Sequence, residues 1–159
     1  MIGEGSYGIV QKALDTQTNQ LVAIKTMKNN QENESIPHFI LREYDCLKAM
    51  QNERGIISLA AVYQEPRNSS QRQGCNIMFV FPFYPQGDLH SFMKGHSSPY
   101  RGESLPTDLA LDFTKQILSA LHKIHKKAYI HRDLKPANIL VGKSSTGFEV
   151  VIADFGLSR

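Results

Sequence analysis

The stretch that decides the fold is His131-Arg132-Asp133-Leu134-Lys135-Pro136-Ala137-Asn138, which is followed after a short interval by Asp154-Phe155-Gly156. It combines two carboxylates, one amide and one lysine. A hydroxyl nucleophile needs a base beside it, and nucleotide phosphates arrive with Mg²⁺, which takes oxygen ligands from carboxylate and amide side chains. Asp133 is suited to act as the base, and Asn138 and Asp154 are suited to act as Mg²⁺ ligands. The residue types and their spacing therefore indicate a site for ATP and magnesium.

A glycine-rich stretch near the start of the chain, Gly3-Glu4-Gly5-Ser6-Tyr7-Gly8-Ile9-Val10, fits the other half of such a site. Glycines let backbone N–H groups approach phosphate oxygens without a Cβ in the way. Dinucleotide-binding folds use a similar string, but they need a helix after it. Here residues 9–14 and 21–27 predict two strands around a polar turn, which argues against the dinucleotide alternative.

Lys25 lies in the second of these strands, in the string Val22-Ala23-Ile24-Lys25, and alternation places it on the same face as Ala23. Residues 35–50 predict a helix with Glu43 at the centre of its apolar stripe. A carboxylate there is costly unless it is paired, so we expect an ion pair with Lys25. The alternative is an edge-strand lysine whose charge extends to solvent.

Together these motifs resemble those of the eukaryotic protein kinases. The resemblance implies an α+β, two-lobed fold, with an antiparallel sheet and one helix in an N-lobe and a truncated helical C-lobe. The N-lobe would span residues 1–84, with its first strand clipped, and the partial C-lobe residues 85–159. Lys135-Pro136-Ala137-Asn138 is typical of serine/threonine kinases, and the glycine loop is most similar to the cyclin-dependent and mitogen-activated branch.

The resemblance also implies a role for individual residues. Asp133 would accept the proton of a protein Ser/Thr hydroxyl, with Asn138 and Asp154 holding Mg²⁺. Glu43 would orient Lys25 toward the phosphates, and Lys135 would steady the transferring phosphoryl group. The residues implied to contact ATP are Ile2, Gly3, Gly5, Gly8, Val10, Ala23, Lys25, Phe81, Tyr84, Asp88 and Leu140.

Some of these assignments compete with a structural alternative. By resemblance, the backbone of residues 82–84 would bind adenine, Phe81 would close the back of the pocket and Asp88 would lie near the ribose. Asp88 is equally suited to be the N-cap of a short helix over residues 89–94. His131 would pack beneath the magnesium motif, and Arg132 would bind a phosphorylated activation loop.

The remaining periodicity predicts the other elements. Residues 56–63 and 76–83 read as strands. Pro106-Thr107-Asp108 begins a long amphipathic helix. A hairpin over residues 139–141 and 150–152 would enclose a solvent-exposed loop at 142–147. The apolar stripe of the long helix comprises Phe113, Ile117, Ala120, Leu121 and Ile124.

Composition bounds the class of protein. The chain has 159 residues, 41% of them hydrophobic, and a formal charge of +3, which is typical of a soluble globular protein. The diffuse positive charge argues against a nucleic-acid partner. No apolar run in the sequence approaches membrane-spanning length, which argues against a membrane partner. Cys46 and Cys75 are isolated, as expected for reduced thiols in an intracellular protein of the cytoplasm or nucleus. The basic residues at 122–127 are typical of a solvated helix face and helix C-terminus.

The sequence ends three residues after Gly156, before the activation segment and the Ala-Pro-Glu motif of a kinase. We therefore expect an excerpt of a longer kinase. The alternatives are a non-catalytic nucleotide-binding or interaction fragment and, more distantly, a small-molecule phosphotransferase. Alone, the fragment is expected to expose the stripe of the long helix and to be poorly soluble and inactive. No regulatory partner is indicated.

Overall fold

A computed structural model describes residues 2–4, 8–27, 36–66, 75–95, 99, 104–145 and 147–159. Along the chain it contains β1 (Gly3–Glu4), β2 (Gly8–Asp15), β3 (Gln20–Met27), α1 (His38–Ala49), β4 (Ala61–Pro66), β5 (Cys75–Pro82), α2 (Leu89–Met93), α3 (Thr107–Lys126), the 3₁₀ turn η1 (Pro136–Asn138), β6 (Ile139–Ser144) and β7 (Gly147–Ile152).

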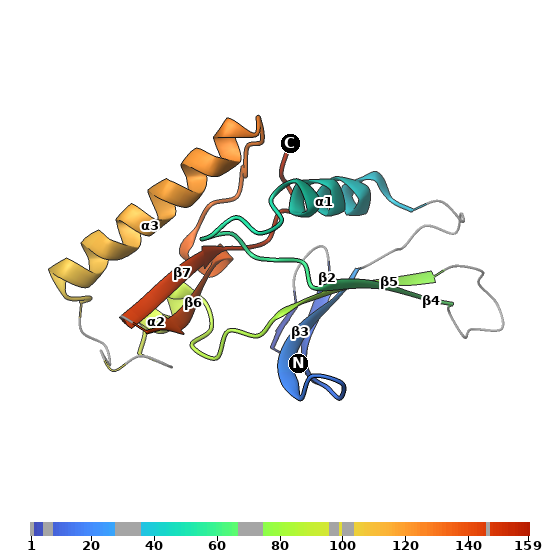
Figure 1. Cartoon of the computed structure of the whole chain (residues 1–159), viewed down its shortest axis with the longest axis horizontal. Helices are drawn as coiled ribbons and strands as arrows, with labels where there is room; N and C mark the ends of the chain where they lie inside the picture. Colours follow the sequence, from blue (N-terminus) through green and yellow to red (C-terminus); the bar gives the residue numbers. More distant parts are fainter. Residues whose placement is uncertain are drawn as a thin grey trace.

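The first five strands form one antiparallel sheet in the order β1-β2-β3-β5-β4, and α1 lies against one face of it (Figure 1). Apolar residues of α1, among them Ile40 and Leu47, pack with Phe79 of β5. The β2–β3 turn is fixed by Asp15, whose carboxylate accepts hydrogen bonds from Gln17 N and the Thr18 hydroxyl. The expected strand–turn–strand arrangement after the glycine loop is confirmed.

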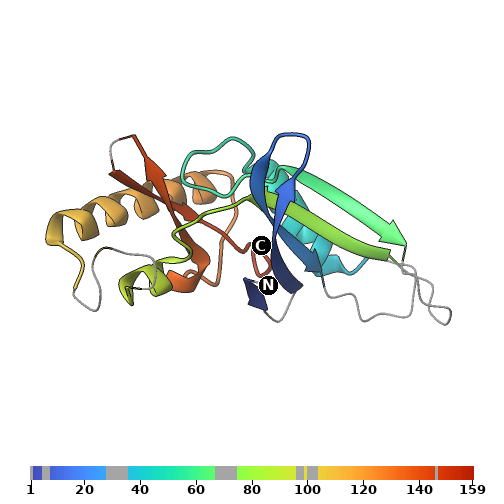
Figure 2. The ribbon, with the colours of Figure 1, turned by 90° about the horizontal axis from the view of Figure 1, so that it is seen from below.

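The second part of the molecule contains α2, α3 and the hairpin β6–β7 (Figure 2). The long helix α3 packs against β7. A small core beneath them comprises Leu89, Phe92, Phe113, Ile139, Val141 and Val150.

The two parts share the main hydrophobic core. Residues 51–60, which connect α1 to β4, reach across to the second part, where Ile57 N donates to Ile152 O and Ile152 N to Gly55 O, each at 2.9 Å. Ile56 on this connector and Ile124 on α3 belong to the same buried cluster as Phe155. A lobe boundary at residue 84 therefore stays an interpretation, because the packing crosses it.

Two strand predictions are wrong in their extent. The strand expected over residues 56–63 begins only at Ala61, and Ile56 forms an isolated bridge with Ile152. A short buried apolar run gives the same pattern whether it is a strand or a packed connector, which explains the error. In the hairpin the strands continue to Ser144 and resume at Gly147, so the loop expected over residues 142–147 is mostly strand.

The expectation of an exposed stripe on α3 is also wrong. Phe113 is 2% and Ile124 0% exposed, and Ile117 and Leu121 are partly buried. Contacts with the connector and the β6–β7 hairpin cover this face. No helix in the described ranges is both long and apolar enough to cross a membrane.

The predicted Glu43 helix begins at His38, with Pro37 at its N-cap in an extended conformation. Ser35, the start expected from sequence, lies outside the described residues. Cys46 on this helix is fully buried, as expected for a structural thiol, and burial raises its pKa. The corresponding expectation for the Cys75 side chain lies outside what the structure describes.

Candidate active site

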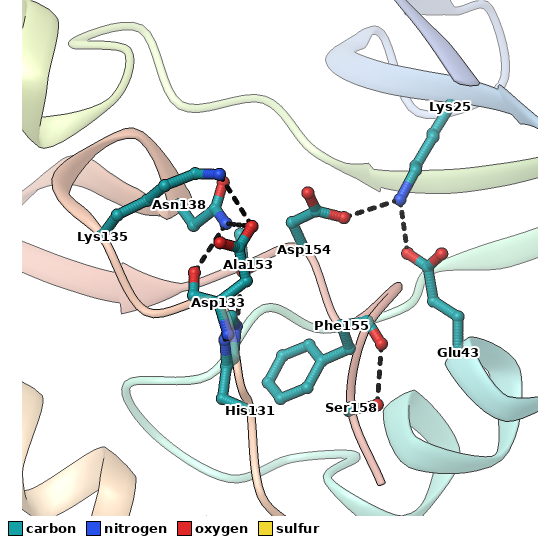
Figure 3. Close-up of polar contacts among 10 residues, drawn as sticks. All are labelled: Lys25, Glu43, His131, Asp133, Lys135, Asn138, Ala153, Asp154, Phe155 and Ser158. Carbon is teal, nitrogen blue, oxygen red and sulfur yellow. Dashed lines mark hydrogen bonds and ion pairs between the residues drawn. The ribbon is translucent and has the colours of Figure 1, made fainter. Parts of the chain in front are cut away.

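Three charged side chains from different elements meet at the boundary between the two parts (Figure 3). Lys25 Nζ on β3 lies 2.7 Å from Glu43 Oε1 on α1 and 2.9 Å from Asp154 Oδ1 after β7. The Lys25 and Glu43 side chains are 11% and 1% exposed, whereas Asp154 is 40% exposed. The predicted Lys25–Glu43 ion pair is present. The edge-strand alternative is wrong because β3 lies between β2 and β5.

The two carboxylates of this cluster stabilise the charge on Lys25. Burial acts to lower the pKa of Lys25, but the adjacent carboxylates of Glu43 and Asp154 outweigh it, so the pKa is raised and the lysine stays charged. Burial raises the pKa of Glu43, and Lys25 opposes that rise. Within the described residues, Glu43 Oε2 is buried without a hydrogen-bond partner, so this carboxylate depends on Lys25 alone.

A second polar cluster surrounds Asp133 in the loop after α3 (Figure 3). Lys135 Nζ donates to Asp133 Oδ2 at 2.7 Å, and Asn138 Nδ2 donates to the same oxygen at 2.9 Å and to the Asp133 carbonyl at 2.8 Å. The hydrogen bond from Lys135, followed by the one from Asn138, lowers the pKa of Asp133. The carboxylate is therefore ionised and held in place near neutral pH.

The tight turn of this loop is what brings the residues together. Pro136 occupies the first turn of η1, where its fixed φ suits the start of a helix. Asn138 is buried at the end of that turn, and its carbonyl accepts from Ala153 N at 2.9 Å. This backbone contact joins the Asp133 loop to the segment that carries Asp154.

His131 also connects the Asp133 loop to the segment that carries Asp154. Its Nε2 lies 2.9 Å from the Ala153 carbonyl, and its ring packs edge-on against Phe155 with centroids 4.9 Å apart. Asp133 N donates to Nδ1 at 3.3 Å, so Nε2 is the protonated nitrogen that donates to Ala153. The expected packing of His131 beneath the magnesium motif is confirmed.

Two site residues have left-handed backbone conformations, Arg132 at φ 63° and Asp154 at φ 61°. Such values are uncommon outside glycine and persist only where surrounding contacts hold them. Arg132 Nε donates to Leu157 O at 2.6 Å, and Ile130 and Arg159 exchange two backbone hydrogen bonds. The segment after Asp154 is thus attached to the Asp133 loop. Binding of a phosphorylated residue by Arg132 stays a prediction.

Part of the glycine-rich stretch lies beside Lys25, because Val10 of β2 pairs with Lys25 of β3. Ile2 N donates to Val10 O at 2.9 Å, and Gly3 pairs with Val10 in the β1–β2 ladder. A Cβ on Gly8 would lie 2.6 Å from Thr26 O, so this position requires glycine. Gly5, also assigned to ATP, lies outside the described residues.

The remaining residues assigned to the nucleotide come from both parts of the molecule. Ala23 pairs with Phe81 across β3 and β5, and Asp88 forms a bridge with Leu140 of β6. The segment between them turns through a hydrogen bond from Gly87 N to Tyr84 O at 3.0 Å. Burial, with a smaller contribution from Glu149, raises the pKa of Tyr84.

Asp88 has the structural role that competed with ribose binding. Its Oδ1 accepts from Ser91 N at 2.9 Å and its Oδ2 from the Ser91 hydroxyl at 2.8 Å, which makes it the N-cap of α2. The expected helix over residues 89–94 is present as Leu89–Met93. Contact with a ribose stays a prediction.

The side-chain oxygens of Asp154 and Asn138 are of the kind that a hard divalent cation binds. Asp154 Oδ1 accepts from Lys25, which leaves Oδ2 for a metal. Asn138 uses Nδ2 to bind Asp133, which leaves its Oδ1. Carboxylate and amide oxygens with room for water are the donor set of Mg²⁺. Among the described residues, no group of three or more His, Cys, Asp or Glu side chains is placed to hold a metal, so these two would need water or phosphate oxygens as further ligands.

Two lysines at the end of α3 make contacts that contradict the reading of residues 122–127 as wholly solvated. Lys127 Nζ donates to Ala49 O at 2.6 Å and lies 3.1 Å from Glu53 Oε1, and Lys123 Nζ donates to Arg54 O at 2.7 Å. Their carbonyl partners lie 78 and 69 residues away in sequence, so no local pattern signals them. Lys127 attaches the end of α3 to the end of α1 and to the connector, and Lys123 attaches α3 to the connector.

Comparison with known proteins agrees with this geometry. A sequence model of the protein kinase domain matches residues 1–159. The chain therefore belongs to the protein kinase family, and its α+β fold is a kinase fold. It is 34% identical over 158 residues to cyclin-dependent kinase 2 of Caenorhabditis elegans, and 31% identical over 163 residues to a serine/threonine-protein kinase of Debaryomyces hansenii.

These alignments cover 99% of this chain but only 39% of the first relative and 25% of the second. The chain thus spans well under half the length of the curated relatives that it matches. The expected likeness to serine/threonine kinases, including the cyclin-dependent branch, is confirmed.

Proposed function

We propose that the chain supplies the ATP- and Mg²⁺-binding half of a protein serine/threonine kinase and transfers the γ-phosphoryl group to a protein hydroxyl. The observation that carries this proposal is the simultaneous contact of Lys25 with Glu43 and Asp154. It places a fixed positive charge beside a carboxylate that is free to bind a cation. Phosphoryl transfer depends mainly on such positioning and charge stabilisation.

Each residue of the two clusters has a role in this proposal. Mg²⁺, held by Asp154 and Asn138, would neutralise phosphate charge when bound. Lys25, oriented by Glu43, binds the α- and β-phosphates. Asp133 accepts the proton of the acceptor hydroxyl, and its lowered pKa keeps it ionised for that purpose. Lys135 donates a hydrogen bond to Asp133 Oδ2, so its charge lies beside the acceptor hydroxyl and stabilises the transferring phosphoryl group.

The nucleotide would lie between the two parts of the molecule. Val10, Ala23 and Leu140 would enclose the adenine, with Phe81 behind it. Residues 82–84 would bind its edge. Among the backbone hydrogen bonds of the described residues, none has Tyr84 N as its donor, which supports its use as a donor to the base. Ile2, Gly3, Gly5 and Gly8 would cover the phosphates, and Asp88 would lie near the ribose.

The acceptor class is tested by product analysis. A polypeptide that contains all 159 residues would be incubated with radiolabelled ATP, Mg²⁺ and a mixture of peptides carrying Ser, Thr or Tyr. We expect label on Ser and Thr. Label on Tyr alone would contradict the serine/threonine assignment, and binding of ATP without transfer to any peptide would favour the non-catalytic fragment.

A further inference from the structure

A groove outside the two clusters of the candidate active site is bordered by the connector, α3 and β7. α3 lies alongside the hairpin at this place (Figure 1). The groove has a volume of about 300 Å³. Its lining consists of Arg54, Gly55, Lys115, Gln116, Ser119, Lys123, Glu149 and Val150, none of which belongs to the two clusters around Lys25 and Asp133.

The walls of the groove are held by specific contacts. Gln116 accepts a hydrogen bond from Val150 N at 2.9 Å and donates to Phe148 O at 3.3 Å, which fixes α3 to β7. Lys123 fixes α3 to Arg54 O, and Gly55 at φ 86° approaches Ala120 so closely that a Cβ would lie 3.1 Å from it. A preformed groove binds a ligand without the entropic cost of ordering its walls.

The charge in the groove is unbalanced. Lys115, Ser119 and Lys123 recur at intervals of four and so share one face of α3, and Arg54 faces them from the connector. Among the described residues, Glu149 is the one acid in the lining. Within the described part of the chain, neither Arg54 nor Lys115 forms an ion pair. Arg54, Lys115 and Lys123 outnumber the acid in this lining, so the groove attracts an anion.

We propose that this groove binds a phosphorylated segment of a partner protein through its phosphoryl group. Arginine and lysine together with a hydroxyl suit a compact anion with several oxygens. An extended run of acidic residues would bring a carboxylate close to Glu149, which would repel it. A single phosphoryl group bound beside Arg54 and Lys115 avoids that repulsion. The described lining residues include no aromatic side chain on which a base could stack, which disfavours single-stranded nucleic acid.

The test is fluorescence polarisation with a labelled Gly/Ser peptide carrying one central phosphoserine, added to a polypeptide that contains all 159 residues. We expect saturable binding that weakens as salt rises. Arg54→Ala and Lys115→Ala should each weaken it roughly tenfold, because each removes a charged hydrogen-bond donor. Glu149→Gln should tighten it. The matched control is Lys126→Ala, an exposed α3 lysine outside the groove, which should change nothing.

Three outcomes would overturn the proposal. The unphosphorylated peptide could bind equally well, inorganic phosphate could compete with the same affinity as the peptide, or Arg54→Ala and Lys115→Ala could bind like the control. Both substituted residues are exposed, so a thermal melt should show unchanged folding. Mg·ATP affinity, measured in the same variants, should stay the same, which separates a failure here from a failure of the proposed kinase function.

Discussion

Lys25 and Asp154, 129 residues apart in sequence, are joined by a 2.9 Å hydrogen bond between Nζ and Oδ1. Because Lys25 also contacts Glu43, one ammonium connects the sheet, α1 and the segment after β7. Displacement of α1 would therefore remove one of the two contacts that hold Lys25 beside Asp154. This coupling is the basis of the first prediction.

Lys25→Met is expected to abolish phosphoryl transfer and to destabilise the fold. It leaves Glu43 buried without its counter-charge, a change that costs about 3–5 kcal/mol for a buried pair. Urea unfolding measures the loss, with Lys143→Met at an exposed position of β6 as the matched control. In a double-mutant cycle with Glu43→Gln, the two effects should not add. Strict additivity would show that the residues do not act as a pair.

Asp133→Asn is expected to lower transfer by roughly 10²–10⁴-fold, the usual contribution of a positioned base, while ATP affinity changes little. The lost carboxylate acts on the acceptor hydroxyl rather than on the nucleotide. A radiolabelled transfer assay and an ATP titration of the same preparation measure the two quantities. Near-normal turnover would remove Asp133 from this role.

Lys135→Ala is expected to shift the pH dependence of kcat/KM. The hydrogen bond from Lys135 is the largest cause of the lowered pKa of Asp133, so its removal lets that pKa rise toward the ordinary value. Asp133 then becomes protonated at a higher pH, so the acidic limb of the kcat/KM profile shifts to higher pH. Lys135→Arg should leave the acidic limb at the pH seen in the unsubstituted protein. An unmoved limb in Lys135→Ala would show that another group controls it.

Lys127→Ala is expected to loosen the end of α1. The lost donor to Ala49 O and the lost contact with Glu53 are both partly exposed, so the cost in stability is roughly 1 kcal/mol. Hydrogen exchange at the amides of residues 46–50 should accelerate. Lys126→Ala, which removes the neighbouring exposed lysine, provides the comparison. Equal exchange in both variants would contradict an anchoring role for Lys127.

Much of the fold, and the contact between Lys25 and Glu43, could be predicted from sequence because the signals are local. The strand and helix that carry Lys25 and Glu43 follow from their periodicity, and their pairing follows from the cost of a buried carboxylate. The extent of β6 and β7 and the contacts of Lys127 could not be predicted, because they depend on partners distant in sequence. The burial of Phe113 and Ile124 was missed for the same reason, since the connector and the hairpin together cover α3.

The most direct test of the central claim is calorimetric titration of ATP at several Mg²⁺ concentrations into a polypeptide that contains all 159 residues. In the unsubstituted protein, nucleotide affinity should rise with Mg²⁺. Asp154→Asn should abolish most of that rise, because it removes the carboxylate proposed to bind the metal. Asp45→Asn, an exposed substitution on α1, should behave like the unsubstituted protein. An unchanged Mg²⁺ dependence in Asp154→Asn would contradict the account.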